Sequence, residues 1–173
     1  MTTTAEQTRT GWVLGPAEAP VTIIEYVNYQ CPDVRNAEPQ LAALRAEAGD
    51  RLRFEVRHLP LTKHARARPA AEAAEAAGAQ GAFWQMHDRL LAPPRALEDD
   101  DLLRAAADLG LDTAQFAADL ESHRHAGAVE ADLDSAREAG ATTTPTLIVN
   151  GVSYRDSEVE QALAQARQLL AEE

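Results

Sequence analysis

The sequence predicts an α/β protein with a mixed central sheet, helices on both faces and an all-helical insertion. Three observations support this. Two strand-like segments near the start of the chain flank one amphipathic helix, the middle of the chain shows only helical patterns, and strand signals return near the end. A length of 173 residues suffices for one well-buried domain that carries an insertion.

Residues 12–62 are predicted to form a β–α–β unit. Residues 21–27 are rich in β-branched and aromatic side chains, which is typical of a buried strand. The apolar residues after Cys31 follow helical spacing until Gly49 ends the pattern, and residues 51–57 then alternate polar and apolar. A helix between two strands implies parallel pairing with a right-handed crossover.

Residues 63–125 are predicted to form the helical insertion. An alanine-rich helix over 65–80 precedes a short amphipathic helix over 83–91, which two prolines stop. Acidic residues open a further helix over 99–109, and a capping pair opens another over 112–120. No strand signal interrupts this part of the sequence.

Residues 126–173 are predicted to complete the sheet. A helix over 126–139 leads to a strand that turns at Asn150-Gly151, the strongest short hairpin signal, and returns antiparallel. Ser157 and Glu160 have the spacing of a capping box that opens a last helix.

The termini and the charge limit the setting and the partners. Residues 1–11 are polar and are predicted to be a flexible arm. They also lack the features of a secretory signal, so we expect a cytoplasmic protein. No apolar run is long enough to span a bilayer. A net charge of −12 argues against partners that are nucleic acids or anionic membranes.

The single cysteine, Cys31, lies where the first predicted strand meets its helix. One thiol excludes an internal disulfide, so Cys31 is either a structural cysteine or a reactive group. Pro32 suits the first turn of a helix, where its missing N–H costs nothing. The positive end of the helix dipole at this position favours thiolate.

The segment Gln30-Cys31-Pro32-Asp33-Val34 resembles the active site of DsbA-like thioredoxin-fold oxidoreductases, which usually carry Cys-Pro-x-Cys here. The similarity continues over roughly residues 12–170. Its other matching features are the acidic Glu25, the helix proline Pro39, Arg57-His58-Leu59-Pro60-Leu61 and Thr143-Thr144-Pro145-Thr146.

This resemblance implies a thioredoxin fold and a role for each matched residue. Cys31 would be the nucleophile, with Pro32 beside it and Glu25 as a buried acid able to relay a proton. Thr144 and Pro145, joined by a cis peptide bond, would present backbone groups to an extended substrate. Asp33 and Val34 would border the same substrate site.

Val34 stands where the family has its second cysteine. A single thiol cannot store an internal disulfide, so we expect monothiol chemistry through mixed disulfides with protein or small-molecule thiols. Peroxide sensing through a sulfenic acid at Cys31 is a variant of this chemistry. Asp33 disfavours the thiolate by like charge and opposes the helix terminus. We expect no bound cofactor, with a glutathione-like thiol as co-substrate.

Two other interpretations remain open. One is a degenerate member that binds extended peptides or a partner without turnover. The other is a kappa-type glutathione transferase or isomerase, which Cys31 disfavours because that branch typically carries serine.

No metal site is predicted: His123 and His125 lack the spacing of a known site and suit a solvated surface. His58 and His64 are weaker candidates for a catalytic role near Cys31 than for edge packing.

Overall fold

The computed structural model describes residues 6–7 and 11–172. Its sheet has six strands in the order β1-β2-β4-β3-β5-β6. The strands are β1 (Glu6–Gln7), β2 (Trp12–Leu14), β3 (Val21–Val27), β4 (Leu52–His58), β5 (Thr146–Val149) and β6 (Val152–Tyr154). The helices are α1 (Pro32–Ala48), α2 (Ala67–Ala79), α3 (Phe83–Leu91), α4 (Asp99–Asp108), α5 (Thr113–Glu121), α6 (Ala126–Ala139) and α7 (Val159–Ala171).

The centre of the sheet has the predicted β–α–β unit. Strands β3 and β4 pair in parallel, with Val21 opposite Leu52 and Val27 opposite His58. β5 pairs antiparallel with the other edge of β3, and β6 follows it through the Asn150-Gly151 hairpin. The sheet is therefore mixed, and β3, which leads to Cys31, lies inside it.

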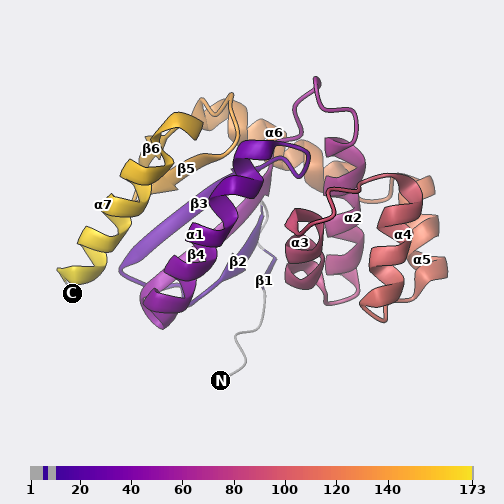
Figure 1. Ribbon diagram of the computed structural model, residues 1–173, viewed down its shortest axis with the longest axis horizontal. Helices are drawn as coiled ribbons and strands as arrows, with labels where there is room; N and C mark the ends of the chain where they lie inside the picture. Colours follow the sequence, from indigo (N-terminus) through magenta and orange to yellow (C-terminus); the bar gives the residue numbers. More distant parts are fainter. Residues whose placement is uncertain (1–5, 8–10, 173) are drawn as a thin grey trace.

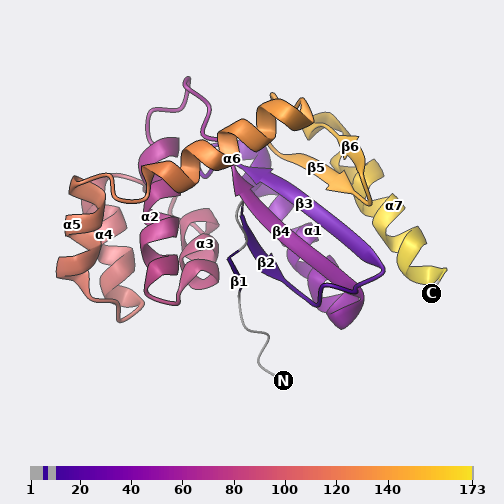
Figure 2. The same ribbon diagram turned by 180° about the vertical axis from the view of Figure 1, so that it is seen from behind.

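Helices cover both faces of the sheet. Figure 1 shows α1 in front of β3 and β4, with α7 beside it, and Figure 2 shows α6 crossing the opposite face. The smaller core under α6 contains Tyr26, Leu59, Ala136 and Ala141. The larger core lies under α1 and α7 and continues into the insertion. Helices α2 to α5 form a bundle beside the sheet.

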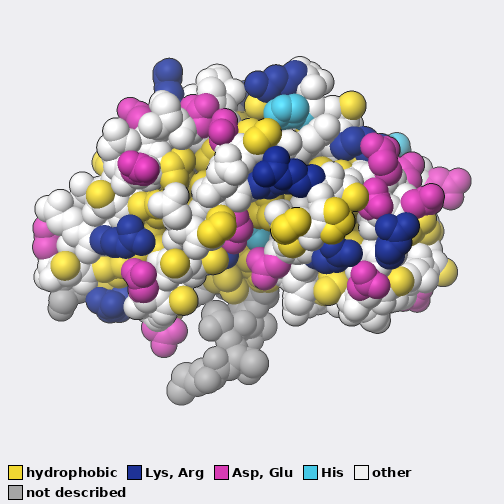
Figure 3. All heavy atoms as spheres, viewed as in Figure 1, with side chains coloured by type: hydrophobic (Ala, Val, Ile, Leu, Met, Phe, Trp, Pro, Cys, Tyr) yellow, Lys and Arg dark blue, Asp and Glu magenta, His cyan; other side chains and the backbone are white. Residues whose placement is uncertain are grey.

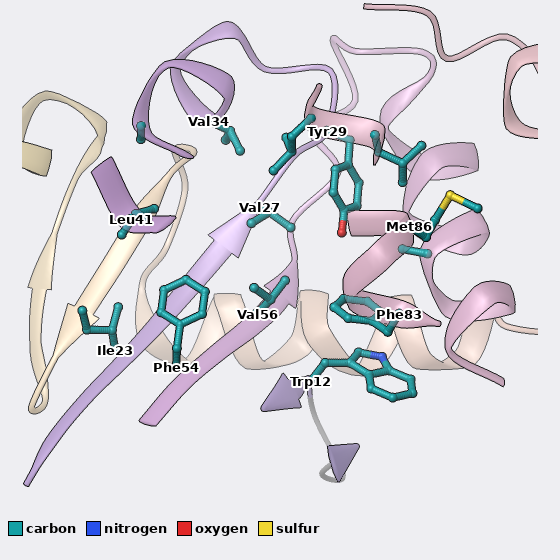
Figure 4. Packing of buried hydrophobic residues seen from close by; sticks show 14 of the residues in the cluster. Trp12, Ile23, Val27, Tyr29, Val34, Leu41, Phe54, Val56, Phe83 and Met86 are labelled. Atoms are coloured by element: carbon teal, nitrogen blue, oxygen red, sulfur yellow. The ribbon is translucent and has the colours of Figure 1, made fainter. Parts of the chain in front are cut away.

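The larger core joins the sheet to the helical insertion through aromatic side chains. The rings of Trp12 and Phe83 stack with 4.7 Å between centroids, so that β2 contacts α3 (Figure 4). Val34 of α1 and Phe54 of β4 are buried in the same cluster, with 0% and 1% exposure. One apolar core therefore fixes the position of the insertion relative to α1.

The ends of the chain hold elements that the sequence patterns did not identify. No pattern identified a strand at residues 12–14, where β2 pairs antiparallel with β4 at the edge of the sheet. Of the predicted arm over residues 1–11, residues 1–5 and 8–10 lie outside the described part, and Glu6–Gln7 pair with β2. The Ser157–Glu160 capping box is wrong, because the Arg155 backbone N–H donates to Glu158 instead.

The surface carries mixed charge. On the face shown in Figure 3, acidic and basic side chains are interspersed. Val152 is the large hydrophobic residue that is most open to solvent among those described, at 54% exposure. No helix in the described part of the chain is long and apolar enough to cross a membrane.

Gly78 of α2 has a packing role that sets up a stability test. A methyl group added there would lie 2.3 Å from Cζ2 of Trp12, too close without a shift of the indole. We expect Gly78→Ala to lower the free energy of unfolding by about 1–3 kcal/mol, although alanine is the better helix former. Urea unfolding followed by far-ultraviolet circular dichroism measures this.

Gly127 of α6 is the matched control. A methyl group added to Gly127 would meet no atom within 4 Å beyond the neighbouring backbone of its own helix. Gly127→Ala should therefore raise the free energy of unfolding by about 0.5 kcal/mol. Equal effects of the two substitutions would contradict the packing role of Gly78.

Candidate active site around Cys31

Cys31 occupies the N-cap position of α1, where strand β3 has ended. Its backbone is extended, with φ −72° and ψ 124°, and its N–H donates to the Asn28 carbonyl at 2.9 Å. Pro32 is the first residue of the helix, which suits a position where no N–H is needed. The strand, the tight turn and the helix start together fix the thiol at the positive end of α1.

The thiol lies against the loop that precedes β5. Cys31 Sγ donates to the Thr144 carbonyl oxygen at 3.3 Å, and the Thr144–Pro145 peptide bond is cis. Cys31 itself is 6% exposed and Thr144 is 3% exposed. The fold thus brings together two residues that are 113 positions apart in sequence, as the resemblance implies.

Asn28 organises the turn that carries the cysteine, and sequence reasoning missed it. Its side-chain oxygen accepts from the Gln30 N–H at 3.0 Å, and its amide nitrogen is 2.7 Å from Nδ1 of His64. The Gln30 side chain in turn accepts from the Arg66 N–H at 2.7 Å. These bonds hold the loop after β4 beside the Cys31 turn, so His64 contacts the turn through Asn28.

Arg35, one turn into α1, is a second residue that the sequence did not reveal. Its Nε donates to the Tyr29 carbonyl at 3.0 Å, and its NH2 group is 3.5 Å from the Leu90 carbonyl at the end of α3. Burial lowers the pKa of Arg35, with a further contribution from Arg95. The guanidinium therefore joins the active-site turn to the insertion.

Glu25 lies on the face of β3 that α1 covers and is fully buried. Neither of its carboxylate oxygens has a hydrogen-bond partner among the described residues. Burial raises the pKa of Glu25 well above its usual range, the nearby Glu38 raises it further, and Arg45 opposes both. A carboxyl group in this state retains its proton at higher pH than an exposed one.

Glu38 of α1 interacts electrostatically with Glu25 and lies near His87 of the insertion. Its Oε1 accepts from Arg45 at 2.6 Å, and its Oε2 is 3.8 Å from Nε2 of His87, beyond hydrogen-bond distance. Burial opposes ionisation of Glu38, but the neighbouring His87 and Arg45 lower its pKa below the ordinary value. The buried Glu25 of β3 and the half-buried Glu38 of α1 therefore have pKa shifts of opposite sign.

The remaining predicted residues divide into exposed and buried ones. Pro32 and Asp33 are exposed beside Cys31. Val34 is fully buried in the core, and its predicted place in the substrate site stays a prediction. His123 and His125 pair with carboxylates, Glu72 at 3.1 Å and Asp119 at 3.1 Å.

A family model described as Thioredoxin matches residues 7–167. The chain belongs to this thioredoxin family. The predicted thioredoxin fold with an all-helical insertion is confirmed, as is the recognition of a DsbA-like member whose second active-site cysteine is replaced.

Curated relatives contain a similar segment within longer proteins. The chain is 45% identical over 155 residues to Na(+)/H(+) antiporter NhaA 3 of Salinispora tropica, a match that covers 89% of this chain and 24% of that protein. Na(+)/H(+) antiporter NhaA of Herminiimonas arsenicoxydans is 43% identical over 145 residues, covering 84% of this chain and 23% of that protein. The chain therefore spans about a quarter of the length of these relatives.

Solved structures of similar folds cover nearly the whole chain. A thioredoxin-like oxidoreductase from Silicibacter pomeroyi DSS-3 has a TM-score of 0.75 and 28% identity, over 95% of this chain and 93% of that one. Pseudomonas aeruginosa DsbA2 has a TM-score of 0.71 and 28% identity, over 93% and 94%. BdbD from Bacillus subtilis, at 21% identity and a TM-score of 0.81 over 98% and 97%, shows the fold alone.

Proposed function

We propose that this thioredoxin-family protein is a monothiol thiol–disulfide oxidoreductase in which Cys31 is the nucleophile. The observation that carries the proposal is the contact of the only thiol with the Thr144 carbonyl, at the N-terminus of α1 and next to the cis Thr144–Pro145 bond. This arrangement orients the sulfur at the positive end of the α1 dipole.

The reaction is a pair of thiol exchanges. The Cys31 thiolate attacks one sulfur of a disulfide, which forms a mixed disulfide and releases the other sulfur as a thiolate that takes up a proton. An external thiol, of a protein or a small glutathione-like molecule, then attacks the substrate sulfur of the mixed disulfide, which forms a new disulfide between these two and releases Cys31 as a thiolate that takes up a proton. The backbone of Thr144 and Pro145 beside the thiol is proposed to align the substrate, and Glu25 to relay the proton.

The setting we propose is the cytoplasm, where reduced small thiols are abundant. They would replace the internal resolving cysteine that Val34 excludes, since Val34 has no sulfur. Asp33, exposed on the first turn of α1, is proposed to border the substrate site.

Oxidised glutathione tests the proposal. We expect one glutathione per chain on Cys31, detected by intact-protein mass, and its complete removal by reduced glutathione. The folded protein should react faster than the chain unfolded in urea near pH 7. Slower reaction of the folded protein would overturn the proposal, because Cys31 would then be a protected structural thiol.

A second candidate is a partner-binding domain without turnover. The curated relatives named antiporters favour this candidate. The match covers 24% of the Salinispora tropica protein, so most of that protein lies outside the matched segment and could serve as the partner. The partner would be a membrane-transport domain that contacts the surface beside Thr144. A protected Cys31 together with binding to such a domain would support this candidate instead.

A further inference from the structure

Three ionisable side chains meet away from Cys31, where the sheet joins the insertion. His58 ends β4, Glu75 belongs to α2 and Asp132 belongs to α6. Their exposures are 0%, 3% and 1%, and one ligand atom from each lies within 4.8 Å of the others. The redox chemistry proposed above uses none of them.

Surrounding contacts hold these side chains in fixed orientations. Nε2 of His58 is 2.9 Å from Oε1 of Glu75, and that oxygen also accepts from the indole N–H of Trp12 at 3.0 Å. The backbone N–H of His58 donates to Oδ2 of Asp132 at 2.8 Å. Hydrogen bonds of this kind orient the ligands of metal sites and restrict their rotation.

Two polar atoms of the cluster are left without a partner. His58 Nδ1 and Asp132 Oδ1 are completely buried and make no hydrogen bond among the described residues. An unpaired buried polar group costs about 1–3 kcal/mol. An enclosed cluster of one imidazole and two carboxylates, in which His58 Nδ1 and Asp132 Oδ1 keep unused hydrogen-bonding capacity, has the chemistry of a cation site.

Burial and neighbouring charges shift the pKa values of this cluster. Burial raises the pKa of Asp132 to about 6, with Glu75 adding to the rise and His58 and Arg57 opposing it. Burial alone would lower the pKa of His58, but Glu75 and Asp132 raise it above its ordinary value. Tyr29, whose ring lies 6.0 Å from His58, stays neutral because burial raises its pKa.

We propose that His58, Glu75 and Asp132 bind a zinc ion that fastens the helical insertion to the sheet. One imidazole nitrogen and two carboxylate oxygens are ligands that Zn²⁺ accepts, at about 2.0–2.2 Å, and a water completes a tetrahedral site. Small side-chain rotations bring the three ligand atoms from their present spread to these distances. This departs from our expectation of no metal site, which did not consider these three residues together.

Metal analysis of the purified protein tests the proposal. A Cys31→Ser background removes the thiol as a competing ligand. After expression in zinc-supplemented medium, we expect one zinc per chain by mass spectrometry of the metal, retained against a chelator while the protein is folded and released on unfolding in guanidinium.

Two substitutions in the cluster and one outside it make the test specific. Asp132→Asn and Glu75→Gln keep the shape of the site but lose a charged ligand, so each should reduce the zinc content at least about tenfold and abolish the zinc-dependent rise in melting temperature. His87→Gln, in the Glu38–His87–Asp88 cluster, is the control and should keep its zinc.

The proposal is overturned if the wild-type protein contains no zinc and its melting temperature does not rise with added zinc. In that case the cluster holds protons only. It is equally overturned if zinc survives both Asp132→Asn and Glu75→Gln, or is lost only in His87→Gln, since the ion then lies elsewhere. The circular dichroism of each variant shows that it is folded.

Discussion

The Val34→Cys variant is expected to form an internal disulfide with Cys31 and to gain multiple-turnover reduction of protein disulfides. Val34 follows Cys31 by three positions, across the first turn of α1, where side chains lie about 5–6 Å apart. Cysteine is smaller than valine, so the fully buried site accommodates it without overpacking. The second thiol would release the mixed disulfide from within the protein.

Insulin reduction by dithiothreitol measures this gain. We expect Val34→Cys to accelerate the reaction by at least about tenfold over the wild-type protein. Asn36→Cys is the matched control, because residue 36 is exposed on α1 and points away from Cys31. It adds a thiol that cannot form a disulfide with Cys31. An oxidised Val34→Cys protein without an internal disulfide, or equal rates for the two variants, would show that position 34 is not the place of a resolving thiol.

The Glu25→Gln variant is expected to be more stable than the wild-type protein above neutral pH. Glu25 is fully buried, its carboxylate oxygens make no hydrogen bond among the described residues, and burial raises its pKa. The stability that its protonated form gives is complete below the unfolded-state pKa of about 4.3 and is lost as the pH rises through the folded-state pKa. Glutamine resembles the protonated form and does not ionise.

Urea unfolding at several pH values measures this difference. The free energy of unfolding of Glu25→Gln should exceed that of the wild-type protein by about 2 kcal/mol near pH 8, and the gap should shrink toward pH 4. Glu138→Gln, an exposed position on α6, is the control and should change little at any pH. A gap that is constant with pH would mean that Glu25 does not titrate between these limits in the folded protein.

The sequence predicts the central elements well because hydrophobic periodicity decides them. Strand β3 has the predicted bounds, 21–27, and α6 begins at Ala126 and ends at Ala139 as expected. Strand β2 was missed because it has only three residues, Trp12–Leu14, too few for alternation to show. Its identity depends on pairing with β4, a long-range contact that no local pattern encodes.

The site also contains residues that the sequence predicts and residues that it does not. Cys31 and the cis Thr144–Pro145 bond follow from a motif, and helical periodicity already placed Val34 among the apolar residues of α1. The Asn28 amide contacts the His64 ring, and the Arg35 guanidinium contacts the Tyr29 and Leu90 carbonyls. The positions of these partners exist only in the folded chain. The one local signal of Asn28 and Arg35 is a polar side chain within four residues of the cysteine, which many surface residues share.

Helix α2 has a consequence for how this protein tolerates mutation. It contacts α3, α4, α5 and α6, and its residues from Ala70 to Gly78 are all buried. Most of them are alanine or glycine, so almost any natural replacement adds volume to a filled space. We therefore expect a deep mutational scan to find few accepted substitutions along this helix. The outer helices α4 and α5 expose more of their side chains. Their sequences can vary and give related proteins different surfaces around the same central helix α2.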